Sequence, residues 1–134
     1  MNRGSLNNKF FYIYFLIVLL LSNNLFADTI KGDSVILGAL DKITAKFSEF
    51  EIDVKKSIKF KSLNIKIFEC QKRPPEEIPE DFVLIRIEDE INISEPIVVF
   101  SGWMLSSSPS LSALEHSTYD IWVKECVINK ISEN

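Results

Sequence analysis

The chain has 134 residues and a formal net charge of −4, and 46% of its residues are hydrophobic. This length fits one domain better than several. Nucleic-acid binding relies on clustered basic charge, and the acidic balance of this chain argues against it.

Residues 1–27 have the order of a secretory signal peptide. Arg3 and Lys9 give a positive start, an unbroken apolar run covers residues 10–21, and the small residue Ala27 precedes Asp28. The pattern predicts export to the periplasm with cleavage after Ala27, which leaves residues 28–134 as a single β-rich domain. The removed part holds two basic residues and no acidic one, so cleavage takes the formal charge from −4 to −6.

The apolar run of 12 residues is shorter than the roughly 20 residues that a membrane-spanning helix needs. An uncleaved N-terminal anchor is the alternative, because Leu25 fits the third position before the cut less well than alanine would. Contact with the membrane is expected only in that case. No cysteine follows the apolar run, which argues against a lipid anchor.

The first half of the predicted domain contains short strands. Residues 35–40 are apolar around a glycine and fit either a strand or a half-turn. From Lys42 the apolar and polar residues alternate, which predicts a half-buried strand, and a shift of phase predicts a bulge near Ser48–Glu49. Residues 58–60 form a short strand that continues over residues 63–67 after a turn or another bulge.

The second half contains a proline-rich loop at residues 71–81 and two strongly apolar strands. Residues 82–87 are nearly all apolar, which predicts a central strand covered on both faces. Residues 97–104 have the pattern of another buried strand, and residues 119–127 form the last strand. The tail after Ile128 is expected to be loose.

One short helix is predicted over residues 106–115. Ser108 can cap it and Pro109 suits its first position, while Leu111 and Leu114 give it a short apolar stripe. With five or six short strands and one helix, the mature chain is expected to be mainly β, as a small antiparallel sandwich or barrel-like domain preceded by the N-terminal signal helix.

The two cysteines, Cys70 and Cys126, both lie in the part that would be exported. Two thiols in an oxidising compartment pair by default, and the bridge would close a loop worth about 4 kcal/mol in the chain-entropy model. By strand parity, both cysteines fall on the less apolar face or at strand ends. The bridge is therefore predicted at the rim of the core.

No cofactor or metal is expected. Two distant cysteines and the single histidine, His116, do not have the spacing of a zinc site. The serines at 106–108 and Asp120 lie near His116 in sequence, so a hydrolase that uses His116 with a nearby serine is an alternative function. The chain has no G-x-S-x-G motif, and we predict no catalytic residue.

The tryptophans offer two interpretations. Both can be ordinary core aromatics, since tryptophan is highly buried on average. Alternatively they belong to an exposed surface for a partner protein, because tryptophan and methionine are enriched at interfaces. The candidate residues of this surface are Trp103, Met104, Leu105, Leu111, Leu114, His116 and Trp122.

Three blocks of sequence resemble an alphaproteobacterial family known as domain of unknown function 2155. They are ALDKITAKFSEFEI from Ala39, FECQKRPPEEIPED from Phe68, and FSGWMLSSSPSLSALEHSTYDIWVKEC over residues 100–126. The chain departs from the family pattern at SSSPSL, where an alanine-rich variant is usual, and at Ser117, where proline is usual. The resemblance implies an exported envelope protein with a paired cysteine framework and implies no reaction.

Three functions follow from these observations. The first is a periplasmic binding or structural module that contacts another envelope protein. The second is the hydrolase already described. The third is an accessory subunit of an envelope membrane complex, which would keep its N-terminal anchor. An exposed apolar patch larger than a few hundred Å² would favour the first or the third.

Overall fold

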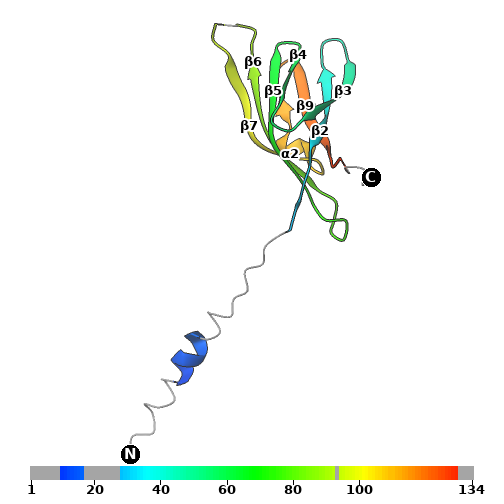
Figure 1. The fold of residues 1–134 in the computed structure, drawn as a ribbon. Coiled ribbons are helices and arrows are strands. Elements are labelled where there is room, and N and C mark those ends of the chain that lie inside the picture. The colour runs from blue at the N-terminus through cyan, green and yellow to red at the C-terminus, as the bar shows by residue number, and fades with distance from the viewer. Residues whose placement is uncertain (1–9, 17–27, 93, 130–134) are drawn as a thin grey trace, which may run out of the picture.

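Two antiparallel sheets make up most of the chain in the computed structural model, which describes residues 10–16, 28–92 and 94–129 (Figure 1). Residues 10–16 are helical and exposed. The following elements are, in chain order, β1 (Ile30–Lys31), β2 (Ser34–Asp41), β3 (Lys46–Asp53), β4 (Ser57–Phe60), β5 (Leu63–Lys72), β6 (Asp81–Asp89), β7 (Ile97–Leu105), α2 (Pro109–Ser112), β8 (Leu114–Glu115) and β9 (Tyr119–Val127).

The strands divide into two layers. Sheet A has the order β1-β5-β6-β7, with β4 also paired to β5, and sheet B has the order β3-β2-β9-β8. Every pair is antiparallel. Figure 1 shows the layers facing each other, with the long strands of sheet A on one flank. The predicted mainly β antiparallel fold is confirmed, and it takes the form of a sandwich.

The core lies between the sheets and follows the two-residue period of the strands. On β5, Leu63, Ile65 and Ile67 are fully buried, and β6 buries every second residue in the same way. They face the buried side chains of β2 and β9 in one cluster. β2 is buried along nearly its whole length, so residues 35–40 form a strand and not a half-turn.

The first hairpin corrects the predicted strand and bulge. Residues 42–45 form the turn between β2 and β3. The carboxylate of Asp41 accepts hydrogen bonds from the backbone N–H groups of Ile43 (3.0 Å) and Thr44 (3.1 Å), which fixes the turn. The pairing of β2 with β3 runs without a register shift, so Ser48–Glu49 is not a bulge. Phe47 lies on the outer face of β3 and stacks on Trp122, whereas Phe50 and Ile52 face the core, so the shift of phase in the sequence reflects apolar residues on both faces of one strand.

Three further expectations for the second half are wrong. β6 is central but covered on its inner face only, so Arg86 is exposed. β7 is an edge strand, and Met104 is its one buried residue. The helix is limited to Pro109–Ser112, because the chain returns to extended backbone at Ala113 and Leu114 pairs in β8. A two-layer sandwich leaves each sheet one open face, which the run of apolar residues did not indicate.

Among the described residues, no helix is long and apolar enough to cross a membrane. Most of the predicted signal peptide, including the predicted cut after Ala27, and the end of the predicted tail lie outside the described residues.

Candidate functional site

Trp103 lies on the outer face of sheet A, beside a shallow apolar hollow. The strand register places it opposite Leu84, and places Leu105 opposite Phe82 on the same face. The hollow has a volume of about 300 Å³ and is lined by Thr29, Gln71, Phe82 and Trp103. Trp103 is 42% exposed and lies on β7, the edge strand that pairs with β6. This is the largest aromatic side chain on that face, and it is available for contact.

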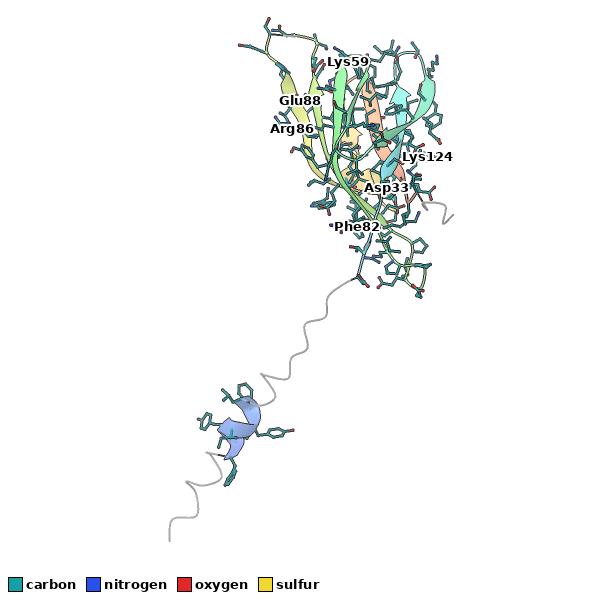
Figure 2. All side chains as sticks on the ribbon, in the orientation of Figure 1. Asp33, Lys59, Phe82, Arg86, Glu88 and Lys124 are labelled. Carbon is teal, nitrogen blue, oxygen red and sulfur yellow. A yellow bond between two sulfur atoms is a disulfide. The ribbon has the colours of Figure 1, made fainter. Side chains whose placement is uncertain are left out.

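Polar groups border the hollow. The hydroxyl of Thr29 donates a hydrogen bond to the side-chain oxygen of Gln71 (3.1 Å). The guanidinium of Arg73 lies 5.5 Å from the centroid of the Phe82 ring. Figure 2 shows Phe82 toward the lower end of the body and Arg86 and Glu88 above it. An apolar centre with a polar border is the usual composition of a protein interface.

The other residues predicted for a partner surface do not join Trp103 in one patch. Met104 and Leu114 belong to the buried core, because alternation turns Met104 inward and β8 pairing turns Leu114 toward the other sheet. Leu111 is 86% exposed on α2. Trp122 lies on β9 of sheet B. The predicted surface is therefore reduced to Trp103 and Leu105, with Leu111 exposed nearby in sequence.

Trp122 lies flat on the outer face of sheet B over Gly38, its cross-strand partner. A Cβ atom at Gly38 would come within 2.5 Å of the indole carbon Cε2. The ring of Phe47 stacks on the indole with centroids 5.8 Å apart and planes at 26°. The glycine thus creates the space that the indole fills. Trp122 belongs to the packing on the outer face of sheet B and is not a member of the core cluster, so it matches neither the core aromatic nor the partner surface that the sequence suggested.

His116 uses both of its ring nitrogens in local contacts. Its Nε2 lies 3.2 Å from Oδ2 of Asp89, and its Nδ1 accepts a hydrogen bond from the backbone N–H of Thr118 (3.3 Å). The ring stacks on Tyr119 with planes at 8°. His116 lies in the loop between β8 and β9, away from the end of α2.

The serines near His116 in sequence point elsewhere. Glu80, just before β6, accepts hydrogen bonds from the Ser106 hydroxyl (3.2 Å), the Ser107 N–H (3.0 Å) and the Ser107 hydroxyl. His116 is held instead by Asp89, the last residue of β6. In residues 28–92 and 94–129, the structure therefore brings no serine hydroxyl to the histidine. The geometry does not support the hydrolase hypothesis.

Glu80 and Asp81 lie at the end of the predicted proline-rich loop, residues 71–81, and the sequence did not indicate their structural roles. Burial by itself raises the pKa of Glu80, but the hydrogen bonds from Ser107 and Ser106 outweigh it and lower that pKa below the ordinary value. Burial raises the pKa of the neighbouring Asp81, although Lys72 partly offsets it. The carboxylate of Glu80 and the backbone of Asp81 join the start of β6 to the segment that follows β7. The acidic residues that follow Pro79 gave no signal of these contacts in the sequence.

Cys70 and Cys126 form a disulfide that joins β5 of sheet A to β9 of sheet B, with Cα atoms 6.0 Å apart. The predicted pairing is confirmed. The predicted position at the rim is wrong, because each cysteine is only 1% exposed and belongs to the core cluster. One extra residue in β5 before Glu69, and another in β9 before Glu125, reverse the parity of each strand.

The described residues contain no group of three or more histidine, cysteine or acidic side chains that could hold a metal ion. The protein is a disulfide-linked β-sandwich with a half-exposed tryptophan, Trp103, on the outer face of sheet A.

The chain belongs to the family described as "Uncharacterized protein conserved in bacteria (DUF2155)", whose model matches residues 35–126. The match runs from β2 to the second cysteine. The chain is also 35% identical over 88 residues to uncharacterized protein RP359 of Rickettsia prowazekii, strain Madrid E. That similarity covers 66% of the chain and 57% of the relative, so the chain spans little more than half of the relative's length. No solved structure matches the chain.

Proposed function

We propose that the protein is an exported module of the bacterial cell envelope that binds another envelope component without catalysing a reaction. The partner surface in this proposal is the outer face of sheet A around Trp103 and Phe82.

Export is supported by the order of charge, apolar run and small residue in residues 1–27. It is also supported by the buried disulfide, because disulfides persist in oxidising compartments and are rare in the cytosol. The bonds of His116 to Asp89 and Thr118 support a non-catalytic role, since a general base needs a nitrogen free to accept a proton.

The observation that carries the binding proposal is the half-exposed indole of Trp103 beside the hollow over Phe82. Tryptophan is enriched among the residues that contribute most to protein interfaces. The other tryptophan covers a glycine, whereas Trp103 remains 42% exposed. An exposed tryptophan with a neighbouring hollow fits a protein partner best.

Crosslinking in cells followed by affinity recovery tests the surface. The Trp103→Ala variant is expected to lower partner recovery about tenfold or more, as loss of a central aromatic contact does. Leu111→Ala shows whether the surface extends to α2. Ile43→Ala is the matched control, since Ile43 is an exposed apolar residue in the hairpin of sheet B. Unchanged recovery with a folded Trp103→Ala variant would contradict the proposal.

Mass measurement of the protein taken from its native compartment tests export and cleavage separately. The expected mass begins at Asp28 and rises by one hydrogen atom per sulfur on reduction. Recovery of the chain from the cytosol with free thiols at Cys70 and Cys126 would refute export.

A further inference from the structure

The free edge of β7 is the longest unprotected strand edge of the sandwich. β7 pairs with β6 on one side, and no strand in residues 28–92 or 94–129 pairs with its other side. Its nine residues, IVVFSGWML, include no charged side chain and no proline. Such an edge is a template for pairing, and natural proteins usually block it with lysine or proline. β4, at the opposite edge of sheet A, carries Lys59 in this way.

The contacts of Leu105 show which backbone groups face outward. Its N–H donates a hydrogen bond to the hydroxyl of Ser112 on α2 (3.0 Å), away from β6. Backbone direction alternates along an antiparallel strand. The N–H and C=O groups of Trp103 and Ser101 therefore also face the open side, whereas those of Gly102 face β6.

Gly102 lies midway between these two residues and has unusual space around it. A Cβ atom placed there would meet no atom within 4 Å, and its backbone φ is not in the left-handed region. Neither the local conformation nor the packing within one molecule requires a glycine at this position. A contact with another molecule would explain why this position has no side chain.

We propose that β7 pairs in antiparallel fashion with β7 of a second copy of the chain, about a two-fold axis at Gly102. In this register Ser101 of each copy lies opposite Trp103 of the other, and each such pair can exchange two backbone hydrogen bonds. The two copies of Gly102 face each other as the pair without hydrogen bonds, in which Cα atoms approach to about 4.5 Å. Sheet A becomes continuous across the two copies.

The side chains favour a second copy as the occupant. Each large Trp103 meets a small Ser101, and the closest position on the axis has no side chain. A two-fold axis at Trp103 would place two indoles opposite each other and would draw in Leu105, whose N–H is already bonded. The absence of charge on β7 lets two acidic copies meet without repulsion at the edge.

The proposed ladder between the two β7 strands is short, and a structural feature limits it at each end. Ser112 occupies the N–H of Leu105 at one end. At the other end, the pairing of β6 with β7 shifts register before Phe100, and such a shift bends the strand. The ladder between copies therefore covers residues 100–104. Two side chains of the inner face, Phe100 and Met104, would meet across the axis.

Disulfide trapping tests the register. In the Gly102→Cys variant, two thiols would lie opposite each other within the Cα spacing that a disulfide accepts. Mild oxidation of the purified protein is expected to give a covalent dimer on non-reducing gels. Ile97→Cys is the matched control, because it lies on the same strand, is exposed, and is far from the proposed axis. Equal crosslinking of both variants, or none, would overturn the register.

Sedimentation velocity over a range of protein concentrations tests the association itself. Wild type is expected to form a dimer, whereas Gly102→Lys places like charges on the axis and should weaken it at least about tenfold. Thermal unfolding checks that the lysine variant is folded, as the open space at this site predicts. A wild-type chain that stays monomeric at every concentration, or a folded Gly102→Lys variant that dimerises as well as wild type, would refute the proposal.

This inference does not rest on the proposed function. Pairing uses the backbone edge of β7, including the backbone groups of Trp103, whereas the proposed partner surface uses the side chains of Trp103 and Phe82 on the outer face. If Gly102→Lys is monomeric yet recovers the envelope partner, both proposals stand as separate properties of sheet A. If the chain never dimerises but Trp103→Ala loses its partner, only the dimer proposal fails.

Discussion

Trp103 and Trp122 lie on the outer faces of opposite sheets, and their surroundings differ. Figure 2 shows that Arg86 of sheet A and Lys124 of sheet B lie on opposite flanks of the body. On sheet B, Trp122 covers Gly38 and stacks on Phe47. On sheet A, Trp103 faces Leu84 across the strands and remains 42% exposed. A glycine across the strand makes one tryptophan structural, and its absence leaves the other available for binding.

The largest expected effect on stability comes from removing the disulfide that joins the two sheets. Replacing both Cys70 and Cys126 by alanine should lower the free energy of unfolding by about 4 kcal/mol, from the entropy of the loop that the bridge closes. Urea unfolding of the variant and of the parent measures the difference, and reduction of the parent should reproduce it. A loss below about 1 kcal/mol would show that core packing holds the sheets together without the bridge.

A pair of glycine substitutions tests the contrast directly. Gly38→Ala forces a Cβ atom against the Trp122 indole and should cost about 1–3 kcal/mol through overpacking. Gly102→Ala meets open space on β7 and should change stability by less than about 0.5 kcal/mol. Thermal unfolding of the two variants under the same conditions gives both values. Equal destabilisation would mean that the space around the two glycines is not what distinguishes the tryptophans.

Truncation of the tryptophans should show the same asymmetry. Trp122→Ala uncovers Gly38 and removes the stack with Phe47, so we expect a loss of about 2 kcal/mol, below the range for fully buried aromatics. Trp103→Ala should cost about 0.5 kcal/mol while it lowers partner recovery about tenfold or more. Denaturant unfolding and the recovery assay, run on the same preparations, separate stability from binding. A Trp103→Ala variant as unstable as Trp122→Ala would assign both residues to packing.

The smallest effect concerns pH and the segment that connects β7 to α2. The lowered pKa of Glu80 contributes stability that is present above the ordinary glutamate pKa and is lost as the pH falls through its own pKa. Glu80→Gln should remove this acid-sensitive part, of about 0.5 kcal/mol, because the bonds to Ser106 and Ser107 are partly exposed.

The neighbouring Asp81 should show the opposite slope. Its raised pKa means that stability declines as the pH rises from the ordinary aspartate pKa through the raised one, and Asp81→Asn should remove that decline. Unfolding curves between acidic and neutral pH measure both slopes. Slopes of the same sign in the two variants would contradict the assignment of opposite shifts.

The sequence predicted correctly those strands in which the apolar residues of the alternating pattern are the residues that face the core. The predicted strand 119–127 has the same limits as β9, whose residues alternate as far as Val123 because one face of the strand meets the core. The strand around Ile58 and the last strand both follow this rule. The failures occurred where the chain reverses or gains one residue. The carboxylate of Asp41 stabilises the turn at residues 42–45, where a strand was predicted. Single extra residues in β5 and β9 direct the cysteine side chains into the core.

The candidate site was predictable only in part. The sequence left open whether Trp103 is a core or a surface residue, and the structure leaves it 42% exposed, whereas Met104 and Leu114, which were grouped with it by proximity in sequence, are buried. Proximity along a strand does not place residues on one face, because successive side chains point to opposite sides. The contacts of Glu80 with Ser106 and Ser107 join residues far apart in sequence, so no local pattern indicated them.

The sequence alone determined the two-residue period of the strands, the pair of cysteines and the signal-like N-terminal order, since these depend on composition and local spacing. Only the tertiary structure decided which tryptophan is exposed, which edge is open and where the cysteines meet. Those properties depend on strand register, and a single inserted residue reverses the register without leaving a clear trace in the sequence.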